Sequence, residues 1–204
     1  MNTFVRGHTQ LITLPFLPSI KLHLADEVIP VWEESELEAP PFWAFAWAGG
    51  QALARYILDN PDLVRGKSVL DLASGSGLVA IAAAQCGASV TANEIDGYAA
   101  EAIALNAAAN NVRVKIHLGD ILDTTIHVDV ILAGDVFYSR DMSNRVLSFL
   151  DRSTSELVLV GDPGRAYAPK SGFTRVAEFT VPVNRDVEDS DHKKAVVLRD
   201  THER

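Results

Sequence analysis

Apolar and polar residues alternate in blocks from residue 67 onward, and these blocks predict strands and helices in turn. Short runs rich in valine, isoleucine and leucine are typical of buried strands, and a stretch suited to a helix follows several of them. The predicted strands are residues 67–73, 88–94, 112–120, 127–135 and 155–162, and the predicted helices are 78–86, 98–111 and 139–152. This alternation predicts a parallel sheet with helices on both faces.

The end of the chain departs from this pattern. Residues 173–183 and 192–200 are strand-like runs separated by the acidic stretch 184–191, with no helix between them. Two strands joined in this way form a hairpin, so at least one antiparallel strand is expected at the edge of the sheet. The whole pattern predicts an α/β fold, a Rossmann-like, doubly wound and mostly parallel seven-stranded sheet with an antiparallel C-terminal hairpin strand.

The start of the chain is expected to be an irregular lead-in with one extended piece at 20–25. Residues 40–50, P-P-F-W-A-F-A-W-A-G-G, are dense in aromatic and small residues, and a helix is predicted at 51–60, where Pro61 closes it. The length suits one domain with a sizeable core. We therefore expect a single domain over residues 1–204, with a lead-in and an aromatic lid at 1–50 and the core at 51–204.

Composition narrows the classes of function. The chain is 48% hydrophobic and 22% charged, as in an ordinary soluble globular protein, and its formal net charge is -9. This charge argues against binding nucleic acids or anionic membranes. It allows an acidic rim that attracts a basic protein segment, although acidic balance also serves solubility. Cys86 is the single cysteine and is expected to be a small core residue, so no disulfide framework is predicted.

The same survey predicts no metal site and no membrane contact. The six histidines form no H-E-x-x-H pattern, and no apolar stretch is long enough to span a bilayer. The first residues make a poor signal peptide. We expect a cytoplasmic protein that acts as a monomer.

A glycine-containing loop marks a candidate cofactor site. Residues 70–77, L-D-L-A-S-G-S-G, join the first core strand to the helix after it, and Gly75 and Gly77 allow close approach of a ligand. Glu94 ends the next strand, where a carboxylate usually binds ribose hydroxyls. Together these features indicate a cofactor that resembles a nucleotide.

Two cofactors compete for this loop. Residues 75–80 match G-x-G-x-x-A, which is typical of dinucleotide sites. Carboxylates, however, are predicted at the ends of four successive strands, at Asp71, Glu94, Asp120 and Asp135. Because such ends share one edge of a parallel sheet, these acids would repel a diphosphate and attract a cation. S-adenosylmethionine, which carries a sulfonium and an ammonium, is therefore favoured over NAD(P).

At these motifs the chain resembles the class I, seven-strand methyltransferases that depend on S-adenosylmethionine. V-L-D-L-A-S-G-S-G, A-N-E-I-D, the Gly-Asp pair at 119–120 and G-D-V-F-Y at 134–138 carry the resemblance. Residues 40–77, with S-I-K-L-H-L-A-D-E-V-I-P-V-W-E and G-D-P-G-R, resemble the electron transfer flavoprotein beta-subunit lysine methyltransferases in particular. The resemblance implies transfer of methyl groups to lysines of that subunit, with ribosomal or other proteins as further targets.

The resemblance also implies roles for individual residues. Asp71 and the loop would hold the methionine end of the cofactor, Glu94 the ribose and Asp120 the adenine. Ala73 replaces a glycine that many members have. The full expected cofactor set is Trp47, Gly49, Asp71, Ala73, Ser74, Gly75, Gly77, Asn93, Glu94, Ile95, Gly119, Asp120 and Gly134.

The expected catalytic residues follow the fourth core strand. Asp135 and Tyr138 form an acid-x-x-aromatic motif that would face the methyl acceptor, and Phe137 is grouped with them. Asp135 would orient the lysine amine, and the rings would face it and its methylated forms. The alternative is that Gly134 and Asp135 simply form a turn.

Several other residues have purely structural roles as alternatives. Trp47 is expected to be a lid, because the small residues after it would let a ligand come close, whereas Phe42 and Phe45 are expected in the core. Asp71 could instead be a structural, helix-capping acid, and Asp162 in G-D-P-G-R could be a turn residue. Alternatives for the whole protein are an NAD(P)-dependent oxidoreductase, a methyltransferase acting on a small molecule or nucleic acid, and a cofactor-binding scaffold.

Overall fold

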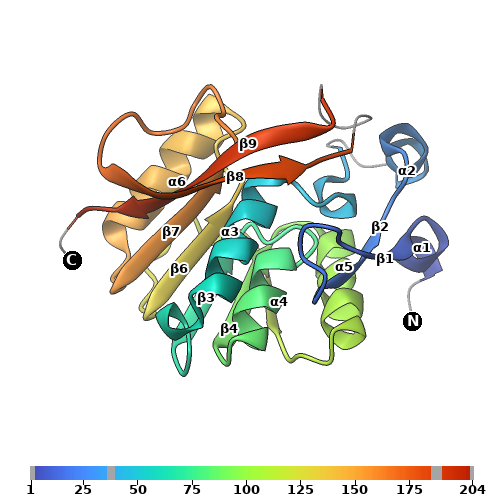
Figure 1. Ribbon diagram of the computed structural model, residues 1–204, viewed down its shortest axis with the longest axis horizontal. Coiled ribbons are helices and arrows are strands. Elements are labelled where there is room, and N and C mark those ends of the chain that lie inside the picture. Colours follow the sequence, from blue (N-terminus) through green and yellow to red (C-terminus); the bar gives the residue numbers. More distant parts are fainter. Residues whose placement is uncertain (1–2, 36–39, 185–189, 203–204) are drawn as a thin grey trace.

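The computed structural model describes residues 3–35, 40–184 and 190–202. Its centre is a seven-stranded sheet in the order β5-β4-β3-β6-β7-β9-β8 (Figure 1). The strands are β3 (Ser68–Leu72), β4 (Ser89–Glu94), β5 (Lys115–Leu118), β6 (Val130–Gly134), β7 (Leu157–Asp162), β8 (Phe173–Pro182) and β9 (His192–Asp200). The chain order reverses direction at β3, where β4 lies on one side and β6 on the other, which is the kind of position where open α/β sheets bind ligands.

Helices cover both faces of this sheet. They are α3 (Ala48–Asp59), α4 (Leu78–Gln85), α5 (Gly97–Ala109) and α6 (Arg140–Arg152). Alternate strand residues such as Val69 and Val130 pack with α3, α4 and Ile103 of α5, while Leu70 and Ile131 point the other way and pack with Phe149 of α6. The predicted doubly wound α/β fold is therefore confirmed.

The C-terminal hairpin is also confirmed. Strand β9 runs antiparallel to both β7 and β8, so it lies one place inside the sheet and β8 forms the edge. A register shift between Arg175 and Ala177 interrupts the pairing of β8 with β9, and an irregularity of this kind bends an edge strand.

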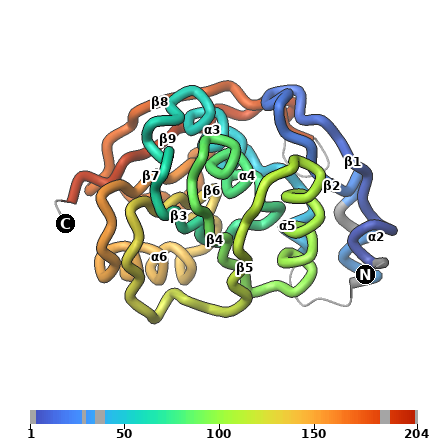
Figure 2. The backbone as a smooth tube through the Cα atoms, turned by 90° about the horizontal axis from the view of Figure 1, so that it is seen from below, coloured from blue at the N-terminus to red at the C-terminus, as the bar shows by residue number. Residues whose placement is uncertain are grey.

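The first 35 residues are more regular than expected. They contain α1 (Thr3–Gly7), β1 (Gln10–Thr13), β2 (Lys21–Leu24) and α2 (Val28–Ser35), and β1 pairs with β2 as an antiparallel hairpin. Both views place these elements beside α5, away from the C-terminal end of the chain (Figures 1 and 2). The extended piece expected at residues 20–25 is confirmed as β2. The sequence pattern did not predict α1, β1 or α2, because elements of 4–8 residues carry little periodicity.

Side chains of α5 attach this hairpin to the core. Asn106 accepts a hydrogen bond from the His23 backbone N–H at 2.6 Å, and Asn110 both accepts from and donates to the Lys21 backbone at 2.9 and 2.6 Å. These bonds act as a substitute for a neighbouring strand along β2. The aromatic segment follows, with a short 3₁₀ turn, η1 (Phe42–Ala44), before α3 begins.

Within the described residues, no helix is long and apolar enough to cross a membrane. The same part of the chain contains no group of three or more His, Cys, Asp or Glu side chains arranged to hold a metal ion.

Candidate active site

The glycine loop between β3 and α4 is one wall of the candidate site. Ala73, Gly75 and Gly77 all have positive φ values, of 52°, 56° and 81°, so the loop turns through left-handed conformations that cost least at glycine. Space around Gly75 is open, since the nearest atom to an added Cβ would be the Trp43 Cα at 4.0 Å. At Gly77 a Cβ would instead meet Ile103 at 3.3 Å. Gly75 therefore leaves room for a ligand, and Gly77 allows α5 to pack closely.

Asp71 does not lie at the end of its strand. It pairs with Ala92 and Leu132 inside β3 and is buried. Its carboxylate accepts hydrogen bonds from the Ser74 hydroxyl and the Ala80 N–H. Burial raises the pKa of Asp71 to about 7, against the lowering effect of these two bonds. The expectation that Asp71 shares the sheet edge with the other acids is therefore wrong, and the alternative of a structural acid that holds the loop to α4 describes its contacts.

Glu94 ends β4, as predicted, and points its carboxylate at the loop. One oxygen accepts from the Gly75 N–H at 2.7 Å and the other from the Ile95 N–H at 2.9 Å. Burial raises its pKa, and the backbone N–H groups oppose that shift. Glu94 thus ties the glycine loop to β4 and lies at the edge where a ligand would enter.

Next to Glu94 the chain exposes two apolar side chains. Ile95 is 73% exposed and Leu118, at the end of β5, is 56% exposed. Side chains of this kind are suited to covering a flat ring. Beside them, Asn93 is buried and donates to the His117 and Gly119 carbonyls at 3.1 and 2.8 Å, so its described role is to join the ends of β4 and β5.

Asp120 lies beyond Gly119, just past the end of β5. It accepts from the Leu122 N–H at 2.9 Å and from Arg145 at 2.8 Å, and these two partners lower its pKa. Asp120 is exposed and stays ionised at the edge of the sheet, next to Leu118.

Four glycines bring α3 onto the carboxyl ends of β6 and β7. A Cβ on Gly49 would lie 2.5 Å from the Gly161 carbonyl oxygen, and one on Gly134 would lie 2.8 Å from the Gly50 Cα. The expected reason for small residues after Trp47, close approach of a ligand, is therefore wrong. Gly49 and Gly134 instead let the first turn of α3 touch the strands.

Asp135 is held at the point where α3 meets the sheet. It follows β6 with a φ of 62°, and its N–H donates to the Gly161 carbonyl at 2.8 Å. Its Oδ2 accepts from the Gly49 N–H at 3.2 Å. A non-glycine residue in this conformation is uncommon and requires support from its surroundings. Here the support comes from a helix N-terminus and a neighbouring strand.

The other oxygen of Asp135 pairs with a residue that sequence reasoning missed. Arg165 Nε donates to Asp135 Oδ1 at 2.6 Å, and the side chains are 23% and 4% exposed. The turn predicted at G-D-P-G-R positions this arginine, because Asp162 Oδ1 accepts from the Gly164 and Arg165 N–H groups. The arginine guanidinium also lies 5.7 Å from the centre of the Trp47 ring. The sequence did offer a signal for this pairing. Arg165 is a cation that lies three residues after the end of the predicted strand 155–162, which follows the strand that ends at Asp135.

An exposed aromatic rim lies beside this ion pair. Tyr138 is 48% exposed and stacks on Phe42 at a centroid distance of 5.5 Å. Phe42 is 41% exposed and lies 5.9 Å from the Trp47 ring, whose Nε1 donates to the Phe42 carbonyl at 2.7 Å. We call Phe42, Trp47 and Tyr138 the aromatic rim. Burial and the charge of Glu94 raise the pKa of Tyr138.

Two expectations about aromatic residues were wrong. Phe42 was expected in the core but lies on the rim, while Phe45 is buried as predicted. Phe137 was expected at the acceptor but is 0% exposed and packs in the core on the α6 side of the sheet. The chain leaves β6 with Val136 and Phe137 pointing inward, so Tyr138 is the first side chain of the motif that points outward.

The match to known proteins agrees with this geometry. Residues 33–177 match the family described as "Lysine methyltransferase", which is more than half of the chain. The chain belongs to this lysine methyltransferase family. The matched region contains the aromatic rim, the glycine loop, the strand-end acids and Arg165.

Individual relatives narrow the family. The chain is 39% identical over 196 residues to the electron transfer flavoprotein beta subunit lysine methyltransferase of Rattus norvegicus, covering 89% of this chain and 77% of the relative. It is 41% identical over 175 residues to the protein of that name from Homo sapiens, covering 81% and 67%. Among solved structures, magnesium protoporphyrin IX methyltransferase of Synechocystis PCC 6803 with bound SAM has a TM-score of 0.56 at 15% identity, covering 74% of this chain and 78% of that one, which shows the shared fold.

Membership of the lysine methyltransferase family removes the oxidoreductase alternative. The G-x-G-x-x-A match at residues 75–80 therefore belongs to a methyltransferase loop in this chain.

Proposed function

We propose that this lysine methyltransferase uses S-adenosylmethionine to methylate a lysine of the electron transfer flavoprotein beta subunit. The observation that carries the proposal is the Asp135–Arg165 pair, which lies against an exposed aromatic rim at the carboxyl end of the sheet. The names of the relatives support the choice of protein substrate.

The cofactor edge fits a cationic nucleoside. Open space at Gly75 admits a ligand beside the loop, and Glu94 presents a carboxylate there. The exposed Ile95 and Leu118 would cover the adenine, with Asp120 next to it. When bound, S-adenosylmethionine supplies a methyl group that is activated by a positively charged sulfur. A diphosphate would face Glu94 and Asp120 instead, which is unfavourable.

The part of the site around Asp135 must bind the lysine of the substrate as a neutral amine. A free lysine has a pKa of about 10.4 and arrives protonated. Arg165 and a cationic cofactor both disfavour that positive charge, and the rim partly desolvates it, so the lysine pKa falls. The proton leaves to water, and the amine is then aligned for transfer.

Asp135 would receive the amine by an exchange of partners. An unpaired buried carboxylate is costly, and the Asp135 side chain is buried and paired with Arg165. As the lysine enters, its nitrogen would donate to Asp135 while the arginine moves toward Trp47, so the carboxylate is never left alone. The rings of Trp47, Phe42 and Tyr138 would then contact the amine and its methylated forms.

The direct test is a methyl-transfer assay with purified protein, methyl-labelled S-adenosylmethionine and the flavoprotein beta subunit, followed by mass spectrometry. We expect label on a lysine of that subunit. Label on a ribosomal protein alone would mean that the substrate is that protein and not the flavoprotein subunit. Label on a small molecule or on nucleic acid would overturn the proposal. A monomeric, cytoplasmic enzyme stays part of the proposal, to be checked by light scattering and cell fractionation.

A further inference from the structure

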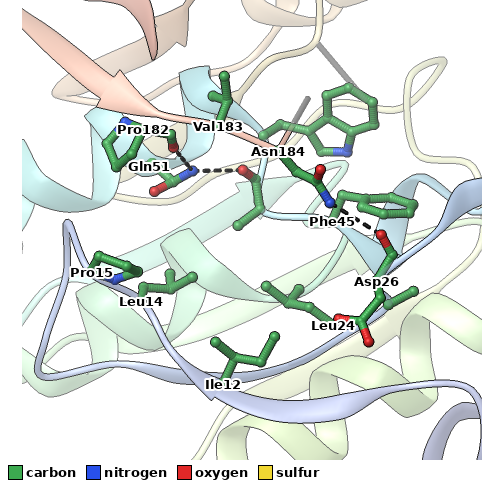
Figure 3. A pocket seen from close by; sticks show the side chains of 13 residues that line it. Ile12, Leu14, Pro15, Leu24, Asp26, Phe45, Gln51, Pro182, Val183 and Asn184 are labelled. Carbon is green, nitrogen blue, oxygen red and sulfur yellow. Dashed lines mark hydrogen bonds between the residues drawn. The ribbon is translucent and has the colours of Figure 1, made fainter. Parts of the chain in front are cut away.

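A cavity that is lined in part by Trp47 has no part in the proposed chemistry. It has a volume of about 240 Å³ and opens between three parts of the chain (Figure 3). Ile12 and Leu24 come from the β1–β2 hairpin, Phe45 and Trp47 come from the aromatic segment, and Val183 directly follows β8. These segments lie outside the parallel core of the sheet, so the cavity is built by additions to it.

Most of the lining is apolar, with a polar group at the wall. The Gln51 amide is buried, and its Nε2 donates to the Ala46 carbonyl at 2.7 Å and to the Pro182 carbonyl at 3.2 Å (Figure 3). These two bonds fix which end of the amide is nitrogen. No residue that the structure describes donates to its Oε1. The Oε1 atom therefore offers a hydrogen-bond acceptor to a peptide N–H.

The cavity is continuous with the proposed acceptor site through one side chain. Trp47 lines the cavity, belongs to the aromatic rim, and lies 5.7 Å from the guanidinium that pairs with Asp135 at 2.6 Å. A peptide whose lysine reaches Asp135 can therefore pass over Trp47 into the cavity. Roughly three extended residues span about 10 Å, and this spacing is part of the inference.

Charge at the mouth favours a protein segment of this kind. Asp26 lies at the opening and is exposed, and the chain as a whole carries a formal charge of -9. A lysine-bearing segment is attracted by such a rim. An apolar side chain then gains by burial against Ile12, Leu24 and Phe45.

We propose that this cavity is a specificity subsite, which binds an apolar side chain of the protein substrate roughly three residues from the methylated lysine. The inference rests on the proposed function, because it assumes a protein acceptor at Asp135. Apolar anchors in small pockets commonly carry much of the selectivity of a peptide interface.

The test fills the cavity and leaves the chemistry alone. Val183→Phe places a larger side chain at its wall, just after β8. Val176→Phe is a matched control on β8 itself, at an exposed position outside the cavity. Ala46→Leu is a second filling variant. We expect both filling variants to raise KM for the protein substrate about tenfold, with kcat and the S-adenosylhomocysteine Kd unchanged. Val176→Phe should behave as wild type.

A substrate scan identifies the occupant. Each apolar residue within about four positions of the methylated lysine is replaced by alanine. One replacement should raise KM with the wild-type enzyme and have no further effect with Val183→Phe, since the two changes remove the same contact.

Failure of this inference differs from failure of the function. Wild-type KM in both filling variants would overturn the subsite while methylation stands. Loss of thermal stability and cofactor binding in both would also overturn it, because the cavity would then be part of the protein's own packing. No lysine methylation by the wild-type enzyme would overturn the function, and the subsite with it.

Discussion

The two halves of the strand-end edge are built in different ways. In the cofactor half, at β3, β4 and β5, Asp71 binds Ser74 and Ala80, 3 and 9 residues away, and Glu94 binds Gly75 and Ile95, 19 residues and 1 residue away. The longest of these contacts joins Asp120 to Arg145, 25 residues away. In the acceptor half, Asp135 binds Gly49, 86 residues away, and Arg165, 30 residues away. The first half is therefore specified mostly by local sequence, whereas the second depends on how α3 and the loop after β7 pack together.

Neighbouring residues of the motif after β6 should separate packing from chemistry most sharply. Phe137→Ala removes a fully buried ring from the α6 side and should cost about 3–5 kcal/mol in the free energy of unfolding. Tyr138→Ala removes an exposed ring and should change stability by less than about 1 kcal/mol, while raising KM for the acceptor. Chemical denaturation and steady-state kinetics measure both. Equal losses of stability in the two variants would contradict the assignment of Phe137 to the core and of Tyr138 to the surface.

The buried acid of the cofactor half gives a pH-dependent prediction. The pKa of Asp71 is raised from 3.8 to about 7 in the folded protein. Between these pH values the folded state holds a proton that the unfolded chain has released. The contribution of this proton to the free energy of unfolding is therefore fully present below about pH 4 and is lost as the pH rises to about 7. Relative to Asp71→Asn, the wild type should lose on the order of 3 kcal/mol across that window. Denaturation at several pH values checks it, and parallel curves for both proteins would contradict it.

The contact between the halves can be tested at a glycine. Gly49→Ala places a Cβ 2.5 Å from the Gly161 carbonyl and should cost about 1–3 kcal/mol through strain, together with activity, since Asp135 binds the same turn of α3. Gly97→Ala is the control, because a Cβ at this helical position meets nothing within 4 Å. It should be neutral or slightly stabilising. Melting temperatures distinguish the two variants. An unchanged melting temperature in Gly49→Ala would contradict the close packing of α3 on the strands.

The smallest effect is expected at the cofactor edge. Glu94→Ala removes a carboxylate from the glycine loop and should raise the S-adenosylhomocysteine Kd about tenfold, with kcat little changed at saturating cofactor. Glu156→Ala, at an exposed side chain that pairs with Lys67, is the control. Calorimetry measures both, and an unchanged Kd in Glu94→Ala would exclude Glu94 from the ribose site.

The difference between local contacts in the cofactor half and long-range contacts in the acceptor half explains which features could be predicted from the sequence. Strand–helix alternation, the C-terminal hairpin and the position of Glu94 follow from local patterns, and the structure agrees with each of them. Asp71 was predicted within the strand 67–73 and was nevertheless grouped with the acids at strand ends, whereas the structure buries it inside β3. Near a strand end, a shift of a single residue decides whether a side chain faces the ligand or the interior.

The acceptor half was harder to predict because its contacts are long-range. Phe137 and Tyr138 are adjacent aromatics, and composition cannot tell which one turns inward. The exposed position of Phe42 depends on η1 and on stacking with Tyr138, 96 positions further along the chain. Arg165 lies in what looked like a simple turn, and its pairing with Asp135 appears only when β6 and β7 lie side by side.

In the proposed mechanism Asp135 binds the methyl acceptor and is not needed for cofactor binding. This role is tested most directly by measuring methyl transfer and S-adenosylhomocysteine affinity in Asp135→Asn. Asp62→Asn, at a side chain that is 91% exposed, is the matched control. We expect Asp135→Asn to lose at least about 100-fold in kcat, a transition-state loss of about 2.7 kcal/mol, with a Kd within about threefold of wild type. A variant that binds cofactor poorly yet turns over normally once saturated would contradict this role.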